Sequence, residues 1–217
     1  FGEDFITKIA VPRGPKTSTG ENGGGEKEQS YIVEDIEIRI TDAGKYILTT
    51  DEEGNTLPVT LEEYKSKLSE TLLEDIPSLD EFRKIWVEPE KRSEMIGNLP
   101  DSGRSPLVIQ SMNEMKNYDL FDVIGEIGYG LNPKTMNERA QAFEYKNITW
   151  LDSINKNSAD VIKAIAGQFA KGGTDDLENP MIFKTPEVSK AGGVPALGKI
   201  GDPQIVLKDT KLRMFTA

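Results

Sequence analysis

The chain has 217 residues, 36% of them hydrophobic and 29% charged, a composition typical of one folded domain, with or without an appendage. It contains no cysteine and no histidine, which excludes disulfides, thiolate metal sites, catalytic triads, zinc hydrolases and HNH-type nucleases. Carboxylate, lysine or tyrosine chemistry remains, with magnesium as the one metal that suits these side chains.

The net charge of −11 is unevenly distributed along the chain. Residues 1–128 carry 14 basic and 27 acidic side chains, whereas residues 129–217 carry 12 and 10. Binding to nucleic acid needs clustered lysine and arginine, so this balance argues against a general nucleic-acid binder. We expect any DNA contact to come from the second half.

The beginning of the chain predicts neither export nor membrane insertion. The first residues, FGEDFITKIA, lack the basic start and apolar middle of a signal peptide, and no apolar run reaches the ~18 residues that span a bilayer. We therefore expect a cytoplasmic protein that does not bind membranes. Because the first residue is Phe1 and not methionine, we expect the sequence to be a fragment of a longer protein.

Residues 1–30 are predicted to form a flexible linker from an upstream domain. The stretch from Pro12 to Ser30 has two prolines, three consecutive glycines and no large apolar side chain.

A small β element is predicted over residues 31–59. Ile36, Ile38 and Ile40 alternate with polar residues, which is the pattern of a half-buried strand. A turn at residues 42–44, the run YILTT and a second turn at DEEGN follow. We expect an antiparallel hairpin or a three-stranded ribbon.

Residues 60–217 are predicted to form a helical domain, because six helix starts occur in this segment. Three match the capping box, in which a hydroxyl and a carboxylate each accept from a backbone amide: Thr60 with Glu63, Ser78 with Glu81, and Thr135 with Glu138. Three others place an N-cap residue directly before proline: Ser105–Pro106, Thr185–Pro186 and Asp202–Pro203. The predicted fold class is mainly α, a compact multi-helix bundle preceded by a small antiparallel β hairpin or ribbon.

One segment resembles a phosphate-binding P-loop but lacks its context. Residues 193–199 match G-x-x-x-x-G-K. However, Ile200 replaces the Ser or Thr that binds magnesium, Pro195 lies inside the loop, and no hydrophobic strand precedes it. We interpret the segment as a loop between helices.

Other acidic motifs also have simpler interpretations. The tripeptides Glu63-Tyr64-Lys65 and Glu144-Tyr145-Lys146 match the E-x-K of magnesium nucleases, but both lie in helical patterns, where the charges face solvent. Asp80-Glu81 occupies the first turn of a predicted helix, where acids stabilise the helix dipole. Asp175 and Asp176 lack the spacing of a calcium loop, and we expect them to cap the next helix.

Several separated segments together resemble one known family. The run DLFDVIGEIGYGLNPKTMNERAQAF, from Asp119 to Phe143, resembles the C-terminal domain of the motor (R) subunit of type I restriction enzymes. The resemblance extends through IEIRITDAGKYILTTDEEG, SLDEFRKIWVEPEKR and FAKGGTDDLENPMIF to the closing residues Lys211 to Phe215, and covers residues 31–217.

The resemblance implies a role in assembly. In this family a nuclease and two RecA-like ATPase domains precede the helical region, so ATP and magnesium belong to the rest of the parent subunit. The implied function is a non-catalytic domain that docks the motor onto the methyltransferase and specificity subunits, with DNA reached through the complex. No catalytic, cofactor or metal residue is carried over to this segment.

Two alternatives remain, a magnesium-dependent nuclease and a stand-alone DNA-binding helical module. Acids on central strands would favour the nuclease, whereas amphipathic helices throughout favour the assembly domain. For a DNA or partner contact, the candidate residues are Lys208, Lys211 and Arg213 near the end of the chain. Lys208 and Lys211 are three residues apart and are expected to share an outward-facing side of a helix, although the helix dipole alone could account for them.

Overall fold

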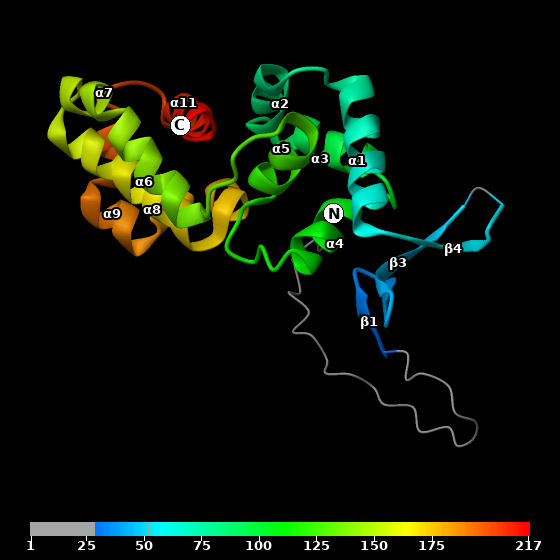
Figure 1. Ribbon diagram of the computed structural model, residues 1–217. Coiled ribbons are helices and arrows are strands. Elements are labelled where there is room, and N and C mark those ends of the chain that lie inside the picture. The colour runs from blue at the N-terminus through cyan, green and yellow to red at the C-terminus, as the bar shows by residue number, and fades with distance from the viewer. Residues whose placement is uncertain (1–28, 52) are drawn as a thin grey trace, which may run out of the picture. The chain divides into compact units, whose positions relative to one another are not determined.

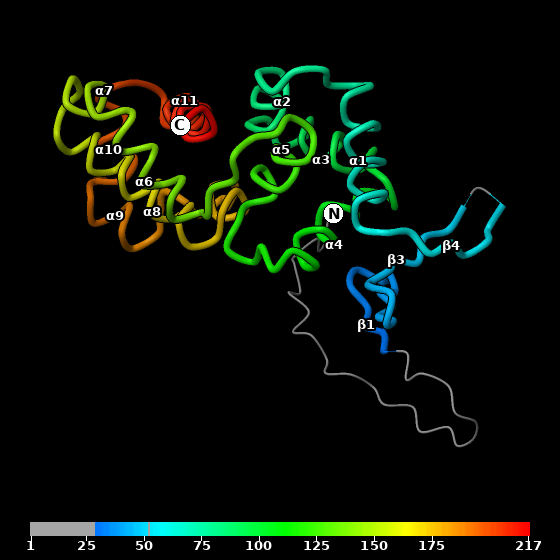
Figure 2. The backbone as a smooth tube through the Cα atoms, in the orientation of Figure 1, coloured from blue at the N-terminus to red at the C-terminus, as the bar shows by residue number. Residues whose placement is uncertain are grey.

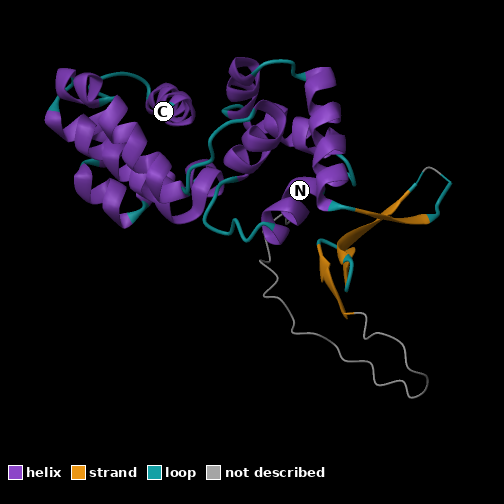
Figure 3. Cartoon of the chain, in the orientation of Figure 1, coloured by secondary structure: helices purple, strands orange, loops and turns teal. Residues whose placement is uncertain are grey.

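The computed structural model describes residues 29–51 and 53–217, so most of the predicted linker lies outside the described residues. The chain divides into two compact units, with the boundary between Leu61 and Glu62. Strands occur in the first unit and helices in the second (Figure 3). This agrees with the predicted fold class.

The first unit contains a four-stranded antiparallel sheet in the order β1-β2-β3-β4. Its strands are β1 (Gln29–Val33), β2 (Ile36–Thr41), β3 (Gly44–Thr50) and β4 (Thr56–Val59). Ile38 and Ile47 face each other across β2 and β3, and both are fully buried. The predicted hairpin or ribbon lacked the first strand. Glu34 and Asp35 form the two-residue turn that joins β1 to β2. Both have positive φ, a conformation for which such turns usually contain Gly or Asn.

The second unit is built from helices that follow one another closely along the chain (Figures 1 and 2). They are α1 (Leu61–Asp75), α2 (Leu79–Trp86), α3 (Pro89–Asn98), α4 (Ser105–Met112), α5 (Leu120–Tyr129), α6 (Met136–Lys146), α7 (Ile148–Ser153), α8 (Lys156–Glu178), α9 (Pro186–Ala191), α10 (Gly193–Leu197) and α11 (Pro203–Thr216), with a short 3-10 helix η1 (Ile182–Lys184).

Three of the predicted helix starts form the expected side-chain caps. The Ser78 side chain accepts from the amide of Glu81, which is one half of the capping box predicted there, and Thr135 and Glu138 form the complete box. The Asp202 carboxylate accepts from the amides of residues 204 and 205 before Pro203 begins α11. Each such cap contributes about 1 kcal/mol to helix stability.

Of the other predicted N-caps, Ser105 is wrong, whereas Thr185 holds the predicted position but forms no side-chain cap. Arg104 already has helical backbone angles, so Ser105 lies inside the first turn of α4, and its buried hydroxyl has no hydrogen-bond partner among the described residues. Thr185 is the N-cap of α9, but its hydroxyl donates to the carbonyl of Ile182 instead of accepting from the helix.

An aromatic cluster forms the centre of the helical core. Phe121 of α5 lies 5.1 Å from Phe82 of α2 and 4.6 Å from Phe215 of α11, measured between ring centroids. Phe169 of α8 contacts Phe215 edge-on at 5.7 Å. All four side chains are fully buried or nearly so. The last helix of the chain therefore packs into the same core as α2.

Candidate partner-binding groove

Helices α1, α2 and α3 enclose a hollow of about 340 Å³. Its floor is apolar and consists of Leu72, Ile76, Ile85, Met95 and Leu99. Its rim is polar and consists of Thr71, Asp75, Lys91, Glu94 and Asn98. The rim carries two acids and one lysine, so the groove combines an apolar floor with a slightly acidic edge. We call it the α1–α3 groove.

The floor of the α1–α3 groove is supported from behind by α5. A Cβ on Gly128 would approach the Leu72 Cδ2 atom to 2.5 Å, so a larger residue there would force the Leu72 side chain to shift. The Tyr129 hydroxyl donates to the Ile76 carbonyl at 2.8 Å. Burial raises the pKa of Tyr129 to about 12, so this hydroxyl keeps its proton at neutral pH.

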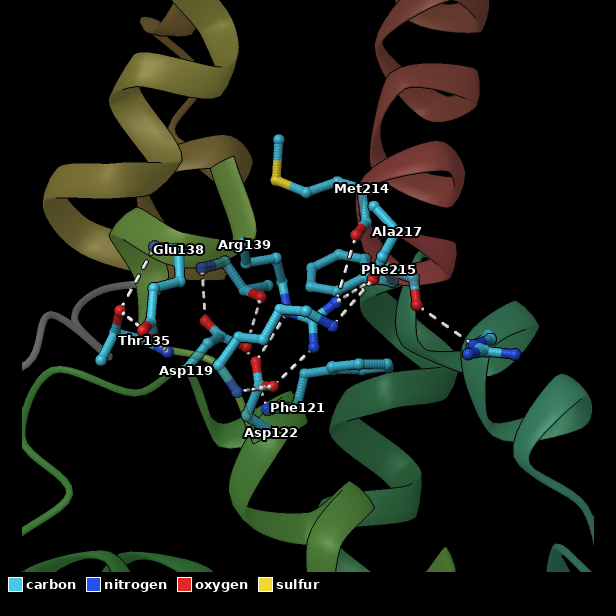
Figure 4. Close-up of polar contacts among 12 residues, drawn as sticks. Asp119, Phe121, Asp122, Thr135, Glu138, Arg139, Met214, Phe215 and Ala217 are labelled. Carbon is cyan, nitrogen blue, oxygen red and sulfur yellow. Dashed lines mark hydrogen bonds and ion pairs between the residues drawn. The ribbon is translucent and has the colours of Figure 1, made fainter. Parts of the chain in front are cut away.

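A buried ion pair connects α5, α6 and α11 (Figure 4). The Arg139 guanidinium donates to both carboxylate oxygens of Asp122, at 2.7 and 2.5 Å, and a third nitrogen donates to the Met214 carbonyl at 3.2 Å. The side chains are 1% and 0% exposed. The Lys134 amide donates to the same carboxylate at 2.8 Å. Each member of the ion pair therefore has a further hydrogen-bond partner in the chain.

A second buried carboxylate, Asp119, ties the start of α5 to α8 and α2. It accepts from the amide and the hydroxyl of Thr174 and from the amide of Phe121. The same Thr174 hydroxyl accepts from the Trp86 indole at 3.0 Å. Burial raises the pKa of Asp119, and the hydrogen bonds from Thr174 and Phe121 act against this effect. Both buried carboxylates thus bind groups of this chain and fix the helices around the aromatic core.

The three residues predicted to contact DNA or a partner lie on α11 and are paired with acids. Lys208 pairs with Glu88, and Arg213 pairs with Asp209 at 2.9 Å. Lys211 pairs with Glu178 at 2.5 Å. Lys211 is only 7% exposed, so the expected outward direction is wrong for this residue: α11 packs that side of the helix toward Glu178 at the end of α8. The proposed DNA contact itself stays a prediction.

The P-loop-like segment was expected to be a loop between helices, and this expectation is wrong: residues 193–197 form the short helix α10, which is followed by a turn. The two E-x-K tripeptides lie in α1 and α6, as predicted. Asp80 and Glu81 lie in the first turn of α2. Asp175 and Asp176 lie just beyond the kink at Gly173, in the first turn of the second helical segment of α8, which agrees with their expected place at a helix start. In residues 29–51 and 53–217, no group of three or more metal-binding side chains is placed to hold an ion.

Sequence reasoning did not single out the α1–α3 groove. The stripe that ends at Leu72 was predicted to be core, and this is confirmed, since Leu72 is 2% exposed; a stripe alone does not show that a hollow borders it. One available signal was Asp75 at the end of α1, because an acid at a helix C-terminus opposes the helix dipole.

Comparison with known proteins places most of the second unit in one family. Residues 62–208 match the family model described as EcoEI R protein C-terminal. The chain belongs to this family. The match contains every residue of the α1–α3 groove. The resemblance to the C-terminal region of type I restriction R subunits is thereby confirmed.

A curated relative agrees with this assignment. The chain is 22% identical over 207 residues to the type I restriction enzyme EcoAI endonuclease subunit of Escherichia coli. The alignment covers 92% of this chain and 25% of the relative, so the chain spans about a quarter of that protein's length. No solved structure matches the chain. In the part of the chain that the structure describes, no helix is long and apolar enough to cross a membrane.

Proposed function

We propose that this chain is a non-catalytic assembly region of a type I restriction R subunit. It docks the ATP-dependent DNA translocase and nuclease onto the methyltransferase and specificity subunits of its complex. Membership of the EcoEI R protein C-terminal family supports the proposal that the chain is part of an R subunit. The observation that carries the docking role is the α1–α3 groove, a preformed apolar hollow inside the matched segment.

The groove suits an amphipathic helix of a partner subunit. Such a helix presents apolar side chains at positions i, i+3 or i+4, and i+7, and an apolar groove accepts them. The acids Asp75 and Glu94 on the rim outnumber Lys91, so basic residues beside the apolar anchors would complement the rim charge. We therefore propose a basic, amphipathic helix of the methyltransferase and specificity subunits as the occupant.

In this proposal the chemistry belongs to the remainder of the parent subunit, including ATP and magnesium. DNA is reached through the assembled complex. The helical placement of the E-x-K tripeptides supports the assembly role over the nuclease alternative, because a magnesium nuclease needs its acids on a central strand.

Deleting residues 60–217 from the complete motor subunit tests the docking role. We expect the truncated subunit to lose co-purification with the methyltransferase and specificity subunits, while it retains ATP hydrolysis. Retained assembly at normal affinity would contradict the proposal. So would magnesium-dependent DNA nicking by the isolated chain that disappears on Glu63→Ala or Glu144→Ala.

A further inference from the structure

Helices α9 and α10 run back along α8 in the opposite direction. Near the middle of α8, the Gln168 amide nitrogen donates to the Glu187 carboxylate at 3.3 Å. Near its start, the Ser158 hydroxyl donates to the Ala196 carbonyl at 2.6 Å. Residues 186–197 therefore lie antiparallel to residues 158–168, and side chains from both segments can share one surface.

The solvent-facing side of α8 carries a row of lysines. Lys156, Lys163 and Lys171 are exposed and follow one another at intervals of seven and eight residues, which is close to two helical turns. At 1.5 Å per residue the row is about 22 Å long. The opposite side of α8 is buried in the core through Val161, Ile165 and other apolar residues.

Helix α9 adds a fourth lysine to this surface. Lys171 pairs with Glu187 of α9 at 2.7 Å, and both side chains are more than half exposed. Lys190 is exposed and lies three residues after Glu187, so it faces the same side of α9. We call Lys156, Lys163, Lys171 and Lys190 the basic stripe. The acids on or beside this surface include Asp160, Asp175, Asp176 and Glu187, and an exposed pair such as Lys171 with Glu187 contributes little to stability.

The basic stripe lacks the features of a protein–protein interface. None of the described side chains of α8 or α9 is a large apolar residue that is exposed, and α10 adds only Val194. Gly167, between Lys163 and Lys171, would meet nothing within 4 Å if it carried a Cβ, so the surface there is open. Protein interfaces have an apolar centre, whereas a phosphate backbone is bound by charge and hydrogen bonds without one.

We propose that the basic stripe binds the sugar-phosphate backbone of duplex DNA without sequence preference. This surface lies on α8 and α9, and the α1–α3 groove lies on other helices, so the inference stands independently of the docking role. It also differs from the earlier candidates on α11, where Lys211 is buried and pairs with Glu178.

A salt series with the complete 217-residue chain tests this proposal. Binding to labelled duplexes of several sequences is measured for the unaltered chain and for Lys163→Glu with Lys190→Glu. Each lost phosphate contact flattens the dependence of log K on log salt by about 0.9, so we expect the slope to fall by nearly two units, equally for every sequence. Asp160→Asn should tighten binding.

The matched control is Lys67→Glu with Lys84→Glu, which changes the net charge equally at exposed positions on α1 and α2. We expect this control to retain the slope, and circular dichroism verifies that each variant is folded. Equal slopes for the two double variants would overturn the proposal. Tighter binding to polyglutamate than to a duplex of the same charge would also overturn it, and would indicate an acidic protein segment as the ligand.

Discussion

Arg139→Leu is expected to lower the free energy of unfolding by about 3–5 kcal/mol, because it leaves the Asp122 carboxylate buried without its cation. The Asp122 side chain is 0% exposed, so water cannot replace the lost guanidinium. The Met214 carbonyl loses the Arg139 donor in the same variant and keeps only the Ala217 amide, at 3.3 Å. Urea denaturation, followed by far-UV circular dichroism, measures the loss.

The double variant Asp122→Leu with Arg139→Leu is the control for that result. It removes both charges together, and buried pairs replaced by apolar residues of similar size often cost little. We expect the double variant to be more stable than the single Arg139→Leu variant. A loss below about 1 kcal/mol in the single variant would show that the pair does not hold α5, α6 and α11 together.

Gly173→Ala is expected to destabilise the chain by about 2–4 kcal/mol. Gly173 has φ 66° and ψ −148° at the kink in α8, a conformation that favours glycine. An added Cβ would also overlap the Asp119 carboxylate, which is held by Thr174 and Phe121 and cannot move without breaking those hydrogen bonds. Thermal and urea unfolding of the variant provide the measurement.

The matched control is Gly167→Ala in the same helix. Gly167 has helical backbone angles and open space around its Cα, so alanine should stabilise the chain by about 0.5–1 kcal/mol. If both alanine variants changed the stability by the same amount and sign, the kink at Gly173 would have no special role.

The sequence allowed the helical elements and much of their core to be predicted. Side-chain caps at Ser78, Thr135 and Asp202 were visible as short local patterns, because a cap involves residues only two or three positions apart. The stripe Val161, Ile165 and Phe169 was equally visible, because helical periodicity places such residues on one side.

Contacts between distant segments could not be predicted in this way. Asp122 and Arg139 lie 17 residues apart, and neither position differs from an ordinary surface charge until α5 and α6 pack together. Lys211 was expected to face solvent for the same reason, since its partner Glu178 lies in another helix. The α1–α3 groove likewise depends on how three helices pack against one another.

The docking account is tested most directly by the affinity of the complete motor subunit for its methyltransferase and specificity subunits. Asp75→Lys with Glu94→Lys reverses both acidic charges on the groove rim. Glu144→Lys with Asp152→Lys makes the same change in net charge at exposed positions outside the groove. We predict that the rim variant raises Kd by about tenfold or more, whereas the control leaves it within about twofold. Equal Kd values for the two variants would contradict docking through this groove.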